Sequence, residues 1–548
     1  MRKPKAKPSA PSHWDSPAQL LIWLASCVAV ISFLFFYQRG QVLLYGDAIA
    51  HINIARRVFD SRTPGLLQLG TVWLPLPHLL MIPFLLFDRM WRDGAGGSMP
   101  SLAAYVLGSV GLFRLIRGAL GGGPEDPPAR AAAWIAALVY AANPNLIYMQ
   151  ATAMGEALYL ALFIWAGVYF VESIPGDAKA LTRCGLCLAA ACLTRYDGWF
   201  LAGAMTCAFL AWMLIRRKSS ESGWPARAAT AKFLLLAAAA PALWLAYNGI
   251  VYRNPLEFEN GPYSAKAIER RSQAGGNPGH PGVGYPLTAT LYFVKAAESN
   301  VAVNPWIERL WLLLAALGMI AAALSPHTRS RALPLLFLLV PLPFYALSVA
   351  YGGVPIFVPA FWPFTHYNVR YGLQLLPAFA AGLGLVFYFV LRLERWNSRL
   401  RGVAVLLLLV LGFTSYASIW RAGPICLEEA QVNMRTRHQL EKQVAAWLEK
   451  LPSNVTLLMY VGDHVGALQQ AGIPLRRVIN EGNHRVWMQP SDPAGLWERA
   501  LAHPSQYADY VVAFEGDPVW QAVQGQHLGE LVEIHVTGQA RAVLYRTR

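Results

Sequence analysis

The segment 45–57 carries the densest group of side chains that could do chemistry. Asp47, His51, Arg56 and Arg57 follow directly after the first long apolar run. If the segment is helical, Asp47 and His51 lie on one face, because residues four apart share a face. Asp47 could then act as a general base at the membrane surface, with the arginines helping to hold a lipid-linked phosphate. The alternative is a surface helix on lipid headgroups, with Asp47 near its N-terminus for dipole reasons.

Glu156 is a second candidate carboxylate. It is predicted at the outer end of an apolar segment, at the same membrane face as Asp47. A charged group near the membrane interior costs roughly 2.5–3.5 kcal/mol on insertion scales, so it is a functional candidate by default. Two carboxylates that converge on one cavity suit a base with an orienting or metal-binding partner. No metal ligand is assigned, although a divalent metal would suit this chemistry. The alternative is a first-turn glutamate favoured by the helix dipole.

Two arginines stand at the ends of apolar segments. Arg195 and Asp197 join two such segments, so they form either a turn with a local ion pair or a turn whose Arg195 faces the cavity. Arg370 begins a later span, where a guanidinium could bind a phosphate through two parallel hydrogen bonds. The alternative for Arg370 is a side chain that extends to the membrane surface.

Further candidate substrate ligands lie in the loops. Tyr263 belongs to the long, glycine-rich, basic stretch 251–305, which is either disordered or a lid ordered by substrate. His366 precedes Arg370, and His78 lies in a proline-rich stretch. Segment 461–464 is either a site or a turn after a strand. The six cysteines form no disulfide framework and are interpreted as small apolar residues.

The composition indicates a membrane protein. Of 548 residues, 55% are hydrophobic and only 14% are charged, which exceeds the apolar content that a soluble protein of this size needs. Apolar runs of about 20 residues recur along the chain, as expected of membrane-spanning helices. The net charge of +15 lies largely in the loops between these runs. This positive charge is therefore better explained by lipid phosphates and by orientation in the bilayer than by nucleic-acid binding.

About eleven transmembrane helices are expected. Run 73–87 is excluded because Pro75, Pro77 and Pro83 interrupt it. With 38–100 and 251–305 as external loops, most basic loops fall on the side of the basic N-terminal segment 1–17, which is predicted to be cytoplasmic. The protein is then a multi-pass protein of the cytoplasmic (inner) membrane. The predicted spans are 18–37, 101–118, 131–148, 154–173, 181–194, 198–215, 231–250, 306–324, 333–350, 371–391 and 402–420.

An odd number of spans places segment 421–548 on the extracytoplasmic side. It is predicted to be a small α/β domain. Helices are expected at 431–451 and around 494–501, and strands at 455–461, 510–514, 531–536 and 542–545.

Several short motifs, taken in order, resemble the GT-C superfamily of polyprenyl-phosphate-dependent glycosyltransferases. The pattern is most similar to protein O-mannosyltransferases and aminoarabinose lipid A transferases. The resemblance covers about residues 18–390. The predicted transmembrane catalytic core is 18–420. The motifs are Gly46-Asp47, Trp73-Leu74-Pro75-Leu76-Pro77-His78, Ala142-Asn143-Pro144-Asn145, Met154-Gly155-Glu156, Leu193-Thr194-Arg195, Tyr247-Asn248, Asn254-Pro255-Leu256 and Arg370-Tyr371-Gly372.

The resemblance implies an inverting transfer of a sugar from a polyprenyl-phosphate donor to a hydroxyl acceptor (protein, lipid or glycan) on the outer face. Asp47 would take the acceptor proton, nearby arginines would stabilise the leaving lipid phosphate, and Glu156 would line the same cavity. The C-terminal domain could bind the acceptor.

The chain also departs from this family pattern. Ala48 stands where many relatives have a second acidic residue, and Leu74 replaces a lysine before a proline pair. These departures leave the donor-phosphate ligand open, and His51 or His78 could substitute for it. The alternative function is a transporter or flippase for an anionic lipid or lipid-linked sugar. A transporter should place its charges near the bilayer midplane, whereas the candidates here are predicted at one face.

Overall fold

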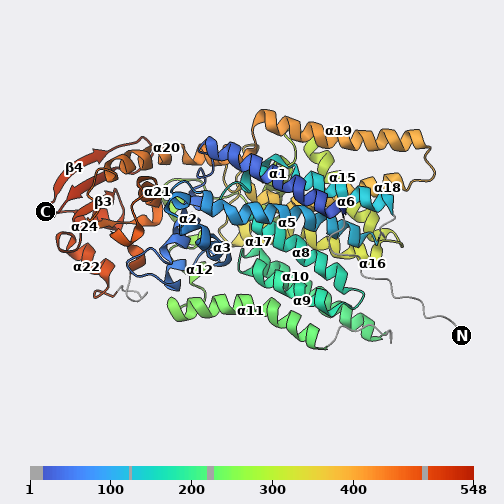
Figure 1. Cartoon of the computed structure of the whole chain (residues 1–548), viewed down its shortest axis with the longest axis horizontal. Coiled ribbons are helices and arrows are strands. Elements are labelled where there is room, and N and C mark those ends of the chain that lie inside the picture. Colours follow the sequence, from blue (N-terminus) through green and yellow to red (C-terminus); the bar gives the residue numbers. More distant parts are fainter. Residues whose placement is uncertain (1–15, 122–125, 219–226, 484–491, 548) are drawn as a thin grey trace.

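A long bundle of helices carries a small α/β domain at one end (Figure 1). This computed structural model describes residues 16–121, 126–218, 227–483 and 492–547. Most of the predicted cytoplasmic segment 1–17 lies outside the described residues. The short helices that follow the first span lie between the bundle and the C-terminal domain (Figure 1).

Every predicted span corresponds to helical structure. Within the described ranges, nine helical segments are long and apolar enough to cross a membrane, which makes the chain a multi-pass helical membrane protein. α6 and α9 are shorter, with 15 residues each. The bundle helices are α1 (Ser16–Gln38), α5 (Ala95–Ala119), α6 (Pro127–Ala141), α8 (Glu156–Ser173), α9 (Ala178–Cys192), α10 (Asp197–Lys218), α11 (Arg227–Val251), α15 (Pro305–Leu324), α17 (Pro341–Tyr351), α18 (Leu376–Leu391) and α19 (Ser398–Ala422).

Two predicted spans are interrupted. The span predicted at 131–148 ends at Ala141, because the Asn143 side chain accepts hydrogen bonds from two backbone N–H groups and starts α7 (Pro144–Met149). The span predicted at 333–350 consists of α16 (Arg329–Ala332), the 3-10 helix η2 (Leu333–Leu339) and α17. Prolines at the helix starts remove backbone donors there and divide the segment.

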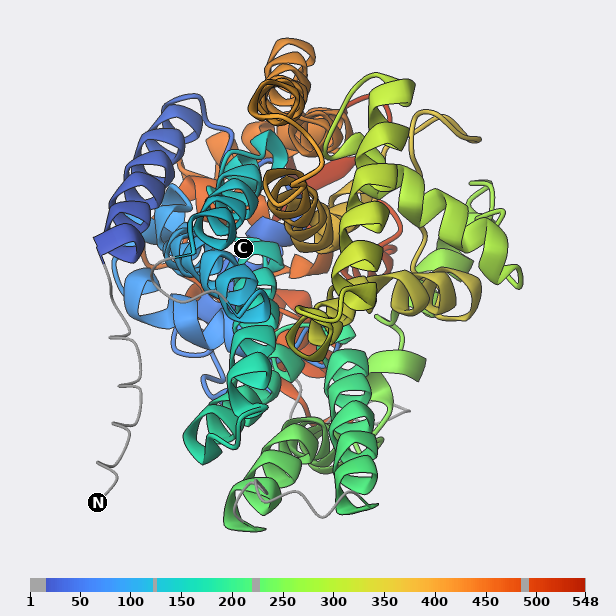
Figure 2. The ribbon, with the colours of Figure 1, turned by 90° about the vertical axis from the view of Figure 1, so that its right-hand side faces the viewer.

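The bundle packs closely where glycines meet. α18 lies against α6 and α15, as the view along the bundle also suggests (Figure 2). A methyl group at Gly318 of α15 would overlap the backbone of Gly382 in α18, and one at Gly382 would overlap the backbone of Ala315. Such contact between small residues is typical of membrane helices, where dispersion forces replace the hydrophobic effect.

The predicted external loops contain short helices. The first holds α2 (Gly46–Arg57), η1 (Leu66–Leu69), α3 (Leu76–Leu85) and α4 (Asp88–Arg92). The second, 251–305, is neither a simple loop nor disordered, because it contains α12 (Glu257–Asn260), α13 (Ala265–Ala274) and α14 (Pro286–Ser299). α14 packs against α17 and against η3 (Val369–Leu375), which leads into α18.

The C-terminal domain has the predicted α/β architecture. Its five-stranded sheet has the order β2-β1-β3-β5-β4, with β1 parallel to β2 and β3, and β5 antiparallel to β3 and β4. The strands are β1 (Leu457–Met459), β2 (Val478–Ile479), β3 (Tyr510–Phe514), β4 (Gly529–Ile534) and β5 (Ala542–Arg546). The helices are α20 (Ile425–Leu448), α21 (Val461–Ala471), η4 (Leu475–Arg477), η5 (Glu481–Asn483), α22 (Leu496–Ala502), α23 (Pro504–Tyr507) and α24 (Pro518–Val523).

Segment 461–464 is not a turn. It forms the start of α21, and only His464 departs from helical backbone angles. The His464 ring stacks on Phe514 with centroids 4.2 Å apart. Burial, together with the nearby Arg437, lowers the pKa of His464 to about 3, so this imidazole is neutral.

Buried polar contacts fix the C-terminal domain to the first predicted external loop. The Asp60 carboxylate accepts hydrogen bonds from Arg56 Nε at 2.8 Å and Arg476 Nη1 at 3.0 Å. Asn53 of α2 donates to Gln469 Oε1 at 2.6 Å, and the Gln68 amide donates to the Gly482 carbonyl at 2.9 Å. The domain therefore packs against the same loop that carries Asp47.

We expect Asp60→Asn to destabilise the protein. The substitution removes a carboxylate whose side chain is 1% exposed and leaves the buried Arg56 with Asp88 as its one anionic partner among the described residues. Breaking a buried ion pair costs about 3–5 kcal/mol. Thermal unfolding of the purified protein should show a clear fall in midpoint.

The matched control is Glu449→Gln. Glu449 is about half exposed and lies 4.0 Å from Arg92, so its loss should cost less than about 1 kcal/mol. An Asp60→Asn midpoint equal to that of Glu449→Gln would contradict the structural role of Asp60.

Candidate active site

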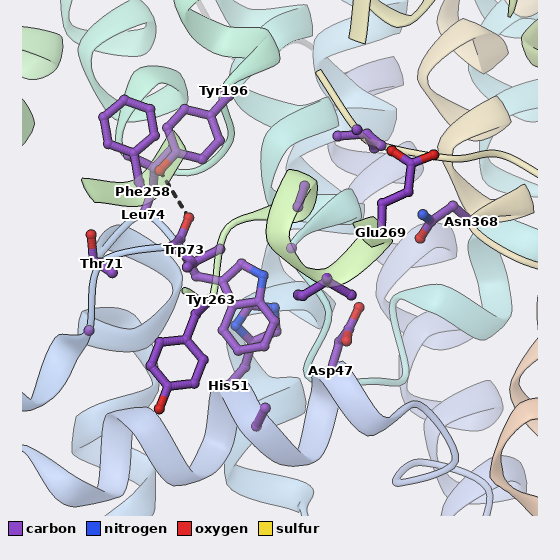
Figure 3. Close-up of a pocket in the computed structure, with 18 of the residues that line it drawn as sticks. Asp47, His51, Thr71, Trp73, Leu74, Tyr196, Phe258, Tyr263, Glu269 and Asn368 are labelled. Atoms are coloured by element: carbon purple, nitrogen blue, oxygen red, sulfur yellow. Dashed lines mark hydrogen bonds between the residues drawn. The ribbon is translucent and has the colours of Figure 1, made fainter. Parts of the chain in front are cut away.

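A cavity of about 1500 Å³ lies where the helical bundle meets the C-terminal domain. Its lining comes from α2, the stretch 67–74, the starts of α8 and α10, α12 and α13, the loop 352–371 and the C-terminal domain. Figure 3 shows Asp47 and His51 on the same face of α2, and the ring of Tyr263, which comes from the segment between α12 and α13, lies above that helix. The predicted shared face of Asp47 and His51 is therefore confirmed.

Helix N-termini converge on this cavity. Asp47 lies in the first turn of α2, Glu156 is the first residue of α8, and Asp197 is the first residue of α10. The positive end of a helix dipole stabilises a carboxylate in the first turn. The helix N-termini thus help to stabilise three carboxylates that lie near one another, although the site contains fewer cations than anions.

Arg370 is the centre of the charged cluster. Its Nη2 lies 2.6 Å from Asp47 Oδ2, its Nη1 lies 2.7 Å from Glu429 Oε1, and its Nε lies 3.3 Å from Glu156 Oε1. Asp47 and Glu156, far apart in the sequence, therefore share one guanidinium. The predicted convergence of these two carboxylates matches the geometry.

Arg195 extends the cluster toward α10. Its Nη1 lies 3.2 Å from Glu156 Oε1, its Nε lies 3.2 Å from Asp197 Oδ1, and its Nη2 donates to the Tyr345 hydroxyl at 2.8 Å. Both alternatives from the sequence therefore hold, because Arg195 forms the local ion pair and also lines the cavity.

The two predicted carboxylates differ in access. The Asp47 side chain is 41% exposed, whereas that of Glu156 is 1% exposed. Asp47 can therefore contact a ligand in the cavity. Glu156 Oε1 lies between the two arginines and is suited to positioning them.

Glu429 of α20 was not predicted as a site residue. Its Oε2 accepts a hydrogen bond from the Val369 backbone N–H at 2.6 Å, while Oε1 faces Arg370. No motif marks this glutamate, and α20 was assigned to the outer domain. Only its position near the start of a helix that directly follows the last span could have suggested a role.

His51 and His78 form a buried pair. His51 Nδ1 lies 2.8 Å from His78 Nε2, so one imidazole donates to the other. Burial lowers the pKa of both, which favours neutral rings. His51 lines the cavity beside Trp73, while His78 is fully buried behind it. A neutral imidazole can donate a hydrogen bond to a ligand but brings no positive charge.

Arg56 and Arg57 point in different directions. Arg56 is held by Asp60, Asp88 and the Leu85 carbonyl, and the structure does not bring it to the cavity. Arg57 lines the cavity at the end near the C-terminal domain. The sequence predicts both arginines as ligands, but the structure places only one of the two, Arg57, at the cavity.

Tyr263 and His366 both line the cavity. The Tyr263 hydroxyl lies 3.4 Å from the hydroxyl of Tyr460 in the C-terminal domain. His366 Nε2 lies 3.6 Å from Glu428 Oε2 at the start of α20. Across the described ranges, no group of three or more His, Cys, Asp or Glu residues is arranged to hold a metal ion.

Comparison with known proteins identifies a shared fold. No family model and no curated protein sequence matches the chain. ArnT from Cupriavidus metallidurans bound to undecaprenyl phosphate is similar in structure, with 13% identity, a TM-score of 0.55, and coverage of 97% of this chain and 98% of that one. Its apo state gives 12% identity, the same TM-score, and coverage of 97% and 99%.

An oligosaccharyltransferase from Archaeoglobus fulgidus in its apo form is more distant. It has 12% identity and a TM-score of 0.46, and the match covers 97% of this chain and 74% of that one. The likeness to ArnT extends over both chains almost from end to end, so the bundle and the C-terminal domain share its overall arrangement.

Proposed function

Because this chain has the GT-C fold, we propose that it is an inverting glycosyltransferase that uses a polyprenyl-phosphate-linked sugar. The acceptor is a hydroxyl group, and the reaction takes place on the extracytoplasmic face. One observation carries the proposal: Asp47 is an accessible carboxylate, oriented by Arg370, on the wall of a large cavity.

Asp47 acts as the general base in this reaction. The acceptor hydroxyl transfers its proton to the Asp47 carboxylate as its oxygen attacks the anomeric carbon. The bond from that carbon to the phosphate oxygen breaks, and polyprenyl phosphate leaves with the electron pair from the opposite side of the sugar. Arg370 and Arg195 stabilise the developing negative charge, since preorganised cations are most effective where charge appears in the transition state.

A lipid-linked donor suits the apolar wall of the cavity. Ile250, Ile268 and Phe344 contribute to its lining, and the Ile250 side chain is largely exposed. ArnT, which has the same fold, was solved with undecaprenyl phosphate bound. An isoprenoid chain would cover this exposed apolar surface, while its phosphate would lie toward the charged cluster.

The position of the charges favours an enzyme over the alternative transporter or flippase. Asp47, Glu156 and Arg370 lie at helix starts next to the C-terminal domain. A transporter would be expected to place such charges at the bilayer midplane. With the basic N-terminus in the cytoplasm, the cavity and the C-terminal domain face outward in the proposed orientation.

The direct test is incubation of the purified full-length protein with a panel of polyprenyl-phosphate sugars and candidate acceptors. We expect one donor to be consumed, with release of polyprenyl phosphate and formation of a glycosidic bond of inverted configuration. Movement of intact lipid-linked sugar across vesicles without any donor consumption would instead establish the transporter.

We expect Glu429→Gln to reduce the transfer rate about 10- to 100-fold, equivalent to about 1.4–2.7 kcal/mol. The amide keeps the shape of the side chain but removes the charge that holds Arg370. Glu449→Gln, on an exposed residue directly after the same helix, is the control and should keep the normal rate. An unchanged rate in Glu429→Gln would show that Glu156 and Asp47 suffice to position Arg370.

A further inference from the structure

Arg57 differs from the two arginines of the charged cluster. Arg195 and Arg370 each contact carboxylates. The Arg57 Nε is buried and has no hydrogen-bond partner among the residues that the structure describes. No carboxylate of the described ranges lies within 4.0 Å of its guanidinium. Arg57 is therefore a cavity cation that no described carboxylate neutralises by direct contact. Arg271, which also lines the cavity and donates to the Pro262 carbonyl at 3.0 Å, is another.

The neighbouring groups are suited to a second ligand contact. Burial raises the pKa of Tyr263 and Tyr460, so both phenols are neutral, and the Tyr460 hydroxyl donates to that of Tyr263 at 3.4 Å. Burial also raises the pKa of Glu481, while Arg57 lowers it, and Glu481 already accepts from the Val461 N–H at 2.9 Å. The other titratable groups around this end include Asp463, Arg271, Glu257, Tyr252 and His78.

The Arg57 side chain is half-buried but its Nε is enclosed, and a buried donor without a partner is costly unless a ligand satisfies it. A guanidinium binds carboxylate or phosphate oxygens through two parallel hydrogen bonds. An oxyanion placed at Arg57 would satisfy its Nε, and the Tyr263 and Tyr460 hydroxyls line the same cavity. This end of the cavity therefore has the chemistry of an anion subsite.

The subsite is distant from the reacting carboxylate. Asp47 and Arg57 are ten residues apart on α2, which corresponds to about 15 Å along the helix axis. The phosphate that leaves the anomeric carbon must lie beside the charged cluster around Asp47. An anion at Arg57 consequently belongs to the other substrate.

We propose that Arg57, with Tyr263 and Tyr460, binds an anionic group of the acceptor, and that the acceptor is an extended oligosaccharide bearing carboxylates or phosphates. Its receiving hydroxyl lies at Asp47, and its anionic group lies near the C-terminal domain. This inference depends on the proposed function. It replaces the sequence-based assignment of Arg57 to the lipid phosphate.

The first test measures binding to the full-length protein in nanodiscs by calorimetry. The probes are tetragalacturonate and its methyl ester, which have the same length but differ in charge, and the pair maltotetraose 1-phosphate and maltotetraose. We expect the charged member of at least one pair to bind about tenfold more tightly, and the pair that shows it identifies the anion. Equal affinities within both pairs would overturn the proposal.

Substitutions locate the effect. Arg57→Gln should abolish the preference for the charged probe, and Arg57→Lys should keep part of it. The control is Arg62→Gln, on an exposed arginine of the same loop that contacts Thr456 outside the cavity; it should keep the full preference. A charge preference that persists in Arg57→Gln would overturn the proposal, and the lysine variant covers the case in which the glutamine variant does not fold.

Donor kinetics separate this proposal from the proposed function. In Arg57→Gln, the KM for the polyprenyl-phosphate sugar should stay unchanged while the KM for the acceptor rises about tenfold. A raised donor KM would assign Arg57 to the donor phosphate and overturn the inference, although the transferase would stand. Charge-dependent binding at Arg57 without any donor turnover by the unmodified protein would support the anion subsite and reject the transferase.

Discussion

Asp47→Asn abolishes detectable sugar transfer and leaves the protein folded: this is the largest effect we expect. Asparagine keeps the size of the side chain and can still accept a hydrogen bond from Arg370, which lies 2.6 Å from Asp47. It cannot take a proton from an acceptor hydroxyl. General-base catalysis contributes about 10²–10⁴-fold, so the rate of polyprenyl phosphate release should fall by at least about 100-fold.

The control for this variant is Asp93→Asn. Asp93 accepts a hydrogen bond from the Tyr37 hydroxyl at 2.7 Å and does not line the main cavity. Its substitution should leave the transfer rate unchanged. Thermal unfolding should show that both variants remain folded. Full activity of Asp47→Asn would reject the general-base assignment.

Glu156→Gln should reduce transfer by about 100-fold or more, which corresponds to about 2.7 kcal/mol or more. Glu156 contacts both Arg195 and Arg370, and its side chain is almost completely buried. Without this carboxylate, the two guanidiniums repel each other and shift from the positions in which they would meet the leaving phosphate. Removing one member of a buried ion pair also destabilises a protein by about 3–5 kcal/mol, so the unfolding midpoint should fall as well.

A control on the same helix distinguishes the role of Glu156 in the charged cluster from a general effect of removing a carboxylate from α8. Glu172, at the other end of the same helix, lies 2.6 Å from Arg114. Glu172→Gln should leave transfer intact. If Glu156→Gln lowers the unfolding midpoint but transfers sugar at a near-normal rate, Glu156 is a residue of the fold and not of the reaction.

The sequence predicted the parts of the site that lie at the ends of apolar segments. Asp47, Glu156 and Arg370 are predicted at one membrane face and Arg195 at the junction of two apolar segments, and the structure brings their side chains into one cluster. Hydropathy is informative here because a span fixes the depth of the residues at its two ends. Few charged residues are predicted at the same membrane depth, so contacts among these residues could be predicted from the sequence.

Other features required tertiary structure. Glu429 reaches Arg370 from a helix more than fifty residues later in the chain, and no spacing rule relates the two. Arg56 and Arg57 are neighbours, yet successive residues on a helix point about 100° apart because the helix has 3.6 residues per turn. Which of them faces the cavity depends on where Asp60 and the C-terminal domain pack, and local sequence does not encode that.

The contact of Gly318 with Gly382 has a consequence for where damaging substitutions will be found. α18 continues from the short 3-10 segment that carries Arg370, and its middle rests backbone to backbone on α15. One additional carbon at either glycine would force the two helices apart and tilt α18, whose N-terminal end carries Arg370. Such a substitution would abolish sugar transfer from within the membrane-spanning region, far from any residue that contacts a substrate.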